Sequence, residues 1–307
     1  MTTAAIVVAL AMASCFGPLA ALLADRLPPR QATWLISVGS VASALSALAV
    51  LALMASDLVG QLPLFAHEGH WSGAALRHHE LTEPGVAVVA MTLLLAAVAG
   101  LALAARRLGL ALLAAYRASS EMAGELVVLP SGPAQAAAVP GRPGRVVVAE
   151  SLLAALSSGE RRALLAHERA HLAHGHHWHR GAVALAAAAN PLLRPLRASI
   201  VYSTERWADE DAAVAVGERR DVATALARVA LLSQGSAAAA ARLALAAQAV
   251  PARVTALLAR PPRARPLLIA ALAVIPLIGI VAVADLLEQT DRLFDLAAHV
   301  YAVSHAA

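Results

Sequence analysis

Four long runs of apolar residues divide the sequence into membrane-spanning and polar parts. They cover residues 4–24, 33–56, 85–105 and 266–285. A helix needs about 20 apolar residues to cross a bilayer, so each run is long enough to do so. The first run has no basic segment before it, which favours a first span over a signal peptide. The pattern predicts four transmembrane helices.

The polar stretch between the third and fourth runs predicts a small α+β domain. Residues 126–129, 135–139 and 145–149 are short apolar segments separated by turns rich in proline and glycine, which is typical of β-strands. Helical patterns follow them. The edge of such a sheet either binds an extended peptide or only packs against the helices, and the sequence leaves both readings open.

These patterns predict a chain organised in three parts. Residues 1–115 form a three-helix membrane region with a polar outside loop at 57–84, residues 116–264 form the inserted domain, and residues 265–307 form the fourth membrane helix and a short outside tail.

The composition agrees with a membrane protein that carries one modest polar domain. The chain is 60% hydrophobic and only 14% charged, whereas a soluble domain is about half apolar and about a quarter charged. Cys15 is the only cysteine, which excludes an intrachain disulfide and a cysteine-ligated zinc finger. The net charge of +4 comes from arginines beside the apolar runs. That placement favours a topology signal over a nucleic-acid surface.

The arginines predict the orientation of the chain in the membrane. The basic flanks are Arg26 and Arg30, then Arg106, Arg107 and Arg117, then Arg253, Arg260, Arg263 and Arg265. The loop at 57–84 and the tail are mainly acidic by comparison. Basic flanks stay on the cytoplasmic side. We therefore expect a multi-pass protein of a bacterial-type plasma membrane, with both termini outside and the inserted domain in the cytoplasm.

Within this domain, His167-Glu168-Arg169-Ala170-His171 forms an HExxH motif. Residues four apart lie on one face of a helix, so both imidazoles can bind one cation, and Zn²⁺ suits such ligands. Glu168 would then be the general base for a bound water. Ser157 and Glu160 have the spacing of a capping box, which predicts the start of the helix. The alternative is a histidine-rich helix that matches the motif by chance.

A third ligand is found further along the chain. Glu205 lies on a second predicted helix and is the natural third zinc ligand, which leaves a fourth position for water or substrate. Asp209 lies one turn later on the same face, where it can orient a ligand imidazole. This acidic pair after an HExxH motif favours a zinc hydrolase.

Four more histidines follow the motif, at positions 174, 176, 177 and 179. They suggest either a second metal site or a polar helix end near the membrane. We expect the polar helix end, because a tract rich in histidine is not by itself strong evidence for a metal site. Tyr202, His174 and Arg206 are the candidates for stabilising an oxyanion.

The motifs together resemble the BlaR/MecR family of membrane zinc metallopeptidases. The similar segments are His167-Glu168-x-x-His171, Asn190-Pro191-Leu192, Glu205-x-x-Ala208-Asp209 and Arg253-Val254-x-Ala256-Leu257-Leu258. The resemblance implies a mainly α membrane protein with a cytoplasmic α+β zincin-like metalloprotease domain between the third and fourth transmembrane helices. It also implies zinc on His167, His171 and Glu205, with Glu168 as the base. The implied substrate is a cytoplasmic protein such as a BlaI/MecI-like transcriptional repressor.

Two other functions remain as alternatives. Ste24/HtpX-like membrane quality-control proteases share the HExxH and ExxxD patterns, and a non-catalytic zinc-containing receptor or scaffold would need no base at Glu168. Antibiotic-sensing relatives carry a penicillin-binding domain after the fourth span, whereas only residues 286–307 follow it here, so we do not expect β-lactam sensing. The expected partners are a protein substrate and membrane lipid, without direct contact to nucleic acid; the oligomeric state is left open.

Overall fold

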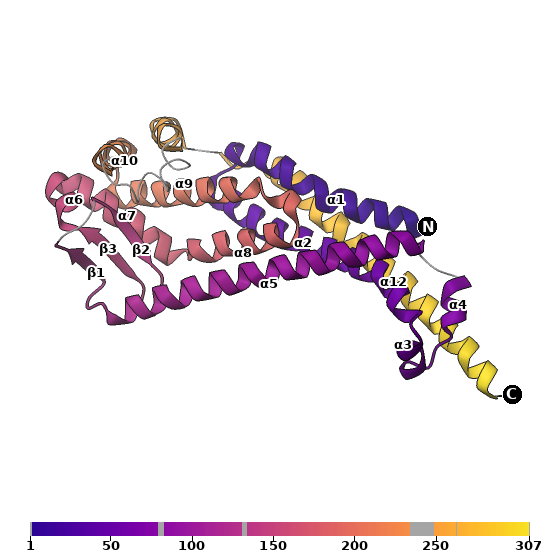
Figure 1. Ribbon diagram of the computed structural model, residues 1–307. Coiled ribbons are helices and arrows are strands. Elements are labelled where there is room, and N and C mark those ends of the chain that lie inside the picture. Colours follow the sequence, from indigo (N-terminus) through magenta and orange to yellow (C-terminus); the bar gives the residue numbers. More distant parts are fainter. Residues whose placement is uncertain (1, 79–82, 131–133, 234–248, 262, 307) are drawn as a thin grey trace.

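Four long apolar helices form the main body of the computed structural model, which describes residues 2–78, 83–130, 134–233, 249–261 and 263–306 (Figure 1). These helices are α1 (Thr2–Leu23), α2 (Pro29–Gly60), α5 (Pro84–Glu121) and α12 (Pro266–Ala306). Each is long and apolar enough to cross a membrane. The prediction of four such helices is confirmed, and they identify the chain as a multi-pass membrane protein.

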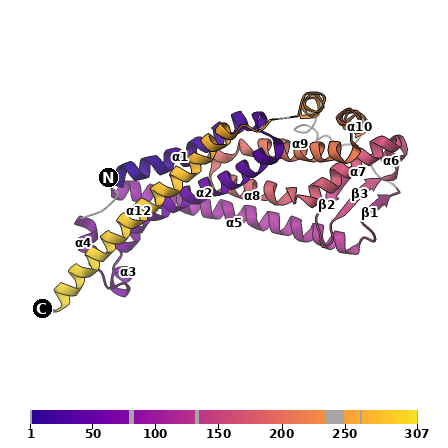
Figure 2. The same cartoon turned by 180° about the vertical axis from the view of Figure 1, so that it is seen from behind.

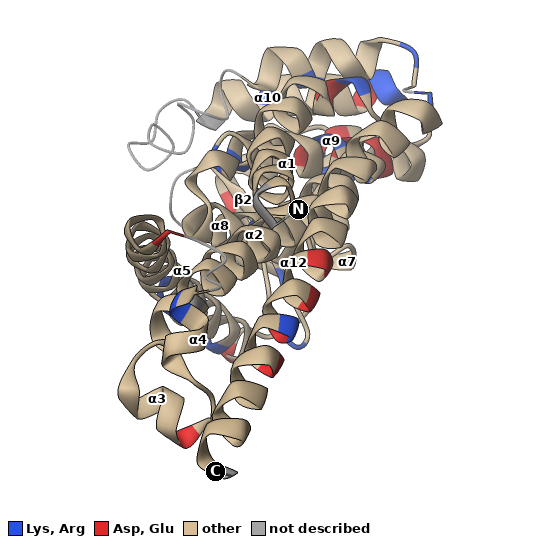
Figure 3. Cartoon of the chain, turned by 90° about the vertical axis from the view of Figure 1, so that its right-hand side faces the viewer, with Lys and Arg blue, Asp and Glu red and all other residues tan. Residues whose placement is uncertain are grey.

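Two of these helices extend well beyond the predicted spans. α5 runs through residue 116, where the sequence predicted the inserted domain to begin, and ends only beside the sheet. α12 runs through most of the predicted tail, because no proline or glycine interrupts residues 280–306. Its outer part packs Leu293 and Ala297 against Ala75 and Leu76. Charged positions are visible along this part of α12 in Figure 3.

The loop between α2 and α5 contains two short helices, α3 (Pro63–Glu68) and α4 (Gly73–His78). Figures 1 and 2 show α3, α4 and both chain termini at one end of the elongated molecule. The β-sheet lies at the opposite end. This arrangement agrees with an even number of spans.

The sheet has three strands, β1 (Leu126–Leu129), β2 (Ala136–Val139) and β3 (Arg145–Ala149). All three lie where the sequence predicts them. Their order is β1-β3-β2, with β1 parallel and β2 antiparallel to β3. β3 is central because its side chains at Val146 and Val148 are buried. β2 is therefore an edge strand, and it packs against α5 and against the helix Ser158–Ala173.

Helices supply the rest of the domain. They are α6 (Glu150–Ala155), α7 (Ser158–Ala173), α8 (His176–Ala189), the 3-10 turn η2 (Pro191–Leu193), α9 (Leu196–Val216), α10 (Arg219–Ser233) and a further helix, Ala249–Leu258. The sequence also predicts a helix at residues 237–249, which lies almost entirely outside the described residues.

α8 and α9 form a hairpin whose tip is inserted between the long helices. Val183 of α8 and Leu196 of α9 lie in one buried cluster with Phe16 of α1 and Ile36 of α2. At the tip, Asn190 Oδ1 accepts a hydrogen bond from the Leu192 amide at 3.1 Å, which starts η2.

The tip of this hairpin makes direct backbone contact with α1. The Asn190 side-chain amide donates to the carbonyl of Ala13 at 3.2 Å. One turn later, a Cβ on Gly17 would lie 2.4 Å from the carbonyl oxygen of Leu192, so only glycine allows this approach. The Asn190-Pro191-Leu192 segment thus holds the hairpin against the first membrane helix.

Replacement of Gly17 by alanine should separate the hairpin from α1. We expect Gly17→Ala to destabilise the protein by about 1–3 kcal/mol, the usual cost of overpacking. Gly109→Ala is the matched control, because nothing lies within 4 Å of a Cβ at this helical position. It should be neutral or stabilise by up to about 1 kcal/mol. Thermal unfolding of both variants in detergent measures the difference, and equal melting temperatures would contradict this account.

Candidate active site

The site is built on α7, whose start is fixed by the predicted capping box. Ser157 Oγ accepts a hydrogen bond from the Glu160 amide at 3.3 Å, and the Glu160 carboxylate accepts one from the Ser157 amide at 2.7 Å. The helix ends before Gly175, whose φ of 58° suits glycine and turns the chain into α8. This frame places His167 and His171 on the same face of α7.

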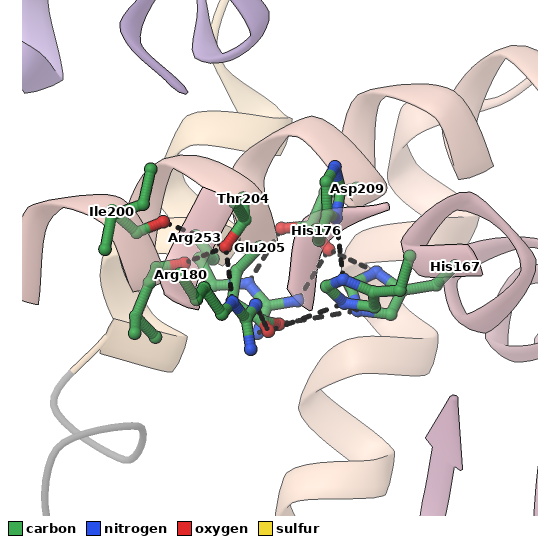
Figure 4. A network of polar contacts seen from close by, with 10 residues as sticks. His167, His176, Arg180, Ile200, Thr204, Glu205, Asp209 and Arg253 are labelled. Carbon is green, nitrogen blue, oxygen red and sulfur yellow. Dashed lines mark hydrogen bonds and ion pairs between the residues drawn. The ribbon is translucent and has the colours of Figure 1, made fainter. Parts of the chain in front are cut away.

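α9 packs against α7 and brings Glu205 to the two histidines. The Nε2 atoms of His167 and His171 are 3.1 Å apart. Glu205 Oε2 lies 3.4 Å from His167 Nε2, and Glu205 Oε1 lies 3.5 Å from His171 Nε2. Figure 4 shows His167 and Glu205 facing one another across this cluster. The three residues suggested by the sequence as metal ligands therefore meet.

The spacing of these atoms fits a tetrahedral zinc ion. Zinc bonds to nitrogen and oxygen are about 2.0–2.2 Å long, so tetrahedral ligand atoms lie about 3.3 Å apart. The two Nε2 atoms are 3.1 Å apart, and each lies 3.4 or 3.5 Å from a different oxygen of the Glu205 carboxylate, so these distances are close to this value. Two imidazoles and one carboxylate are also the donor set of catalytic rather than structural zinc sites.

Asp209 lies behind His167, where its expected orienting role would place it. Its Oδ1 atom is 3.0 Å from His167 Nδ1, and its side chain is buried. A carboxylate at Nδ1 fixes the ring so that Nε2 faces the ion. Burial alone would raise the pKa of Asp209, but the Arg253 guanidinium holds it below its usual range.

Two arginines complete the cluster, and their contacts could not be read from the sequence. Arg253 donates from Nε and Nη2 to the two carboxylate oxygens of Asp209, at 2.8 and 2.6 Å, and its Nη1 is 2.8 Å from Glu205 Oε2. Arg180 donates to Glu205 Oε1 at 2.7 Å and to Thr204 Oγ1 at 2.8 Å. The sequence did contain one indication that Arg180 has a specific role, because it is the only arginine in the otherwise apolar and histidine-rich α8.

The contact of His176 with His171 was not predicted from the sequence either. The Nδ1 atom of His176 lies 2.7 Å from His171 Nδ1, and the residue is buried. The expectation of a polar helix end at the four histidines is wrong for His176 and His179, because α8 packs both of them inside. Burial, with a contribution from Arg180, lowers the pKa of His176 to about 3, so its neutral ring can accept a hydrogen bond from His171.

The electrostatics of the cluster favour a cation between the two ligand rings. Burial opposes charge on His167, yet hydrogen bonds to Asp209 and Glu205 raise its pKa to about 10. Burial and the neighbouring His167 lower the pKa of His171 to about 2, which keeps this imidazole neutral. The carboxylates that favour a proton on His167 would equally favour a divalent ion.

Glu168 lies on α7 beside the same cluster, at the wall of a small cavity. Burial raises the pKa of its carboxyl, while the charge on His167 and a hydrogen bond from the Ala138 backbone act in the opposite direction. The Ala138 contact brings the edge strand β2 next to Glu168. A carboxyl with a raised pKa is suited to accept a proton and release it again near neutral pH.

The three oxyanion candidates have other partners. His174 pairs with Asp211 and stacks on Trp207. Arg206 forms an ion pair with Glu210 and lies within 3.5 Å of the Tyr202 hydroxyl. The structure therefore directs these side chains away from the role suggested for them.

Comparison with known proteins agrees with this site. The model of peptidase family M48 matches residues 105–259, just over half of the chain. The matched region contains α7, α8, α9 and the helix Ala249–Leu258, and so every residue of the cluster. No curated protein and no solved structure matches the chain. The family match and its extent show that the chain belongs to peptidase family M48, a family of zinc metalloproteases.

Proposed function

We propose that this protein is an integral-membrane zinc endopeptidase whose catalytic domain faces the cytoplasm. The observation that carries the proposal is the meeting of His167, His171 and Glu205 beside Glu168. The family match and the four apolar helices support a membrane metallopeptidase. The arginine flanks described above support a cytoplasmic catalytic domain.

The chain's own residues bind and orient the reacting groups. His167, His171 and Glu205 would hold a zinc ion, which would act as a Lewis acid on the scissile carbonyl and lower the pKa of water to about 7. Glu168 takes the proton of the attacking water on its carboxylate and delivers it to the leaving amine nitrogen. Asp209 and His176 orient the two ligand imidazoles through their Nδ1 atoms.

Arg180 and Arg253 hold the Glu205 carboxylate from two sides. Such charge-assisted contacts restrict the rotamers of a side chain that must present an oxygen to the ion. Because the arginines pair with both oxygens, Glu205 keeps its position without help from solvent.

The edge of the sheet offers a binding mode for the peptide. β2 is an edge strand, and its residue Ala138 donates a backbone hydrogen bond toward Glu168. An extended peptide that adds to this edge would pass directly over the catalytic carboxylate. We therefore favour substrate binding over a purely structural role for the sheet.

Glu168 also separates the enzyme from a scaffold that merely retains a structural ion. A structural site has no use for a buried carboxyl between its two histidine ligands, and it is usually closed by four protein ligands. Among the described residues, only His167, His171 and Glu205 form a potential metal cluster. This three-residue donor set supports catalysis.

The two resemblances imply different substrates on the same side of the membrane. A BlaR/MecR-like regulator would cleave a DNA-binding repressor such as BlaI or MecI. A Ste24/HtpX-like quality-control protease would cleave many misfolded membrane proteins. We propose the regulatory role, because Asn190-Pro191-Leu192 holds the α8–α9 hairpin against the first membrane helix, where movement of the spans would reach the site.

The purified protein should bind one zinc ion per chain through the proposed ligands. We expect His171→Ala to lose stoichiometric zinc, and Asp209→Asn to weaken zinc affinity about 10–100-fold, as loss of an orienting carboxylate does. His177→Ala, outside the metal cluster, is the control and should keep its zinc. Metal analysis after competition with a chelator measures each affinity. Full zinc content in His171→Ala would exclude the proposed ligand set.

Glu168→Gln should retain zinc and lose proteolysis. Removing a general base lowers turnover by about 10²–10⁴-fold, while the ligand atoms remain in place. Arg169→Gln is the matched control, because its side chain is the exposed neighbour of Glu168 on the same helix. Cytoplasmic fragments from cells with wild-type, Glu168→Gln and Arg169→Gln proteins are compared by mass spectrometry.

One small DNA-binding protein cut only in wild-type and control cells would identify a regulatory protease. Cleavage of many misfolded membrane proteins would instead identify a quality-control protease. Unchanged fragments in Glu168→Gln cells would refute the assigned base.

The membrane orientation can be measured with introduced cysteines. In a Cys15→Ser background, Ala74→Cys reports on α4, Ser304→Cys on the end of α12 and Ser158→Cys on the start of α7; all three positions are exposed. We expect a membrane-impermeant maleimide to label the first two in intact spheroplasts and Ser158→Cys only after permeabilisation. Labelling of Ser158→Cys in intact spheroplasts would place the catalytic domain outside.

A further inference from the structure

A cavity of about 160 Å³ lies directly beside the catalytic cluster, between α7 and α10. One end is formed by His167, Glu168 and Glu205. A group that enters this cavity therefore lies next to the proposed zinc ligands and the general base. No step proposed above uses it.

The other end of the cavity is apolar. α7 contributes Ala163 and Leu164, and α10 contributes Val222, Ala225 and Leu226. The α10 residues are spaced three and four apart, so they lie on one face of the helix and turn toward α7. Ala163, Leu164, Val222 and Ala225 are buried, so this wall belongs to the packed interior of the domain.

The one arginine among the residues described at the cavity wall is fully engaged. Arg253 lines the cavity, but its guanidinium pairs with both Asp209 and Glu205. A charged side chain from a substrate would lose its hydration here and meet an apolar wall in return. The chemistry of the cavity therefore selects apolar groups.

We propose that this cavity receives an aromatic or large aliphatic side chain of the peptide substrate, adjacent to the scissile bond. The proposal rests on the endopeptidase function proposed above. The volume of the cavity indicates the size of this side chain, because an apolar cavity of about 150 Å³ is large enough to bind benzene. Phenylalanine, leucine, isoleucine and methionine match both the size and the polarity of the site.

The position of the sheet brings a peptide to the mouth of this cavity. Leu164 belongs to an apolar cluster against which Ala136 of β2 and Val229 of α10 pack. β2 therefore borders the apolar wall, and its Ala138 amide reaches Glu168. A peptide extended along β2 turns alternate side chains to this side, so one of them can enter the cavity while its backbone crosses the catalytic carboxylate.

The assignment can be tested by the cleavage preference of the purified full-length protein on a proteome-derived peptide library. Products identified by mass spectrometry should show aromatic or large aliphatic residues at one position flanking the cut. We expect a preference of at least about tenfold over alanine and glycine, since a single methylene in an apolar pocket changes kcat/KM about 10–200-fold.

Ala225→Leu fills the cavity and should move the preference to alanine, serine and glycine by a similar factor. Thr224→Leu is the matched control, because it adds a similar side chain at the exposed neighbouring position of α10. It should leave the preference unchanged. Leu226→Ala enlarges the cavity, so cleavage should then also occur beside tryptophan. This second variant tests the pocket even if Ala225→Leu fails to fold, which loss of bound zinc would reveal.

The possible results separate a failure of the pocket assignment from a failure of the proposed endopeptidase function. Cleavage by the wild type with a preference that Ala225→Leu and Leu226→Ala both leave unchanged would overturn the pocket and keep the endopeptidase. Absence of cleavage by a zinc-loaded wild type would overturn the proposed function, and the pocket assignment with it.

Discussion

A buried carboxylate holds the catalytic half of the molecule together. Asp209 accepts two hydrogen bonds from Arg253 and lies against His167, so it joins α9 to α7 and to the helix Ala249–Leu258. Removing these charges from water is costly, and each is compensated only by its neighbours. If Arg253 were lost, both Asp209 and Glu205 would lose their strongest partner. The ligand geometry therefore depends on a helix far along the chain from the HExxH motif.

The parts of the fold that local patterns determine could be predicted from the sequence. Apolar runs of sufficient length gave the four long helices, and short apolar segments between proline and glycine turns gave the three strands. The ends of the helices were harder to predict. α12 continues to residue 306 because its outer part packs on α4, a contact that no local pattern contains. The insertion of the α8–α9 hairpin likewise depends on a glycine in α1.

In the candidate site, too, some contacts could be predicted from the sequence and others could not. The spacing of the HExxH motif places His167 and His171 on one face of any helix, so their meeting follows from helical periodicity. Glu205 and Asp209 are one turn apart for the same reason. By contrast, Arg180 reaches Glu205 only because α8 packs against α9, and His176 reaches His171 only across the Gly175 turn. The histidine-rich segment looked like a solvated helix end, but tertiary packing buries His176 and His179.

If α1 crosses the bilayer as proposed, the docking of the hairpin tip on α1 determines how far the catalytic centre lies from the lipid. Ala13, which the Asn190 side chain contacts, lies at the middle of α1, and the centre of a bilayer core is about 15 Å from its surface. α8 has 14 residues and is about 21 Å long, and its first residue, His176, contacts His171. With the proposed function and orientation, peptide bonds would be cut close to the headgroup layer. A soluble substrate of the proposed protease would then have to bring a flexible segment down to that layer, whereas a folded surface held farther away would stay intact.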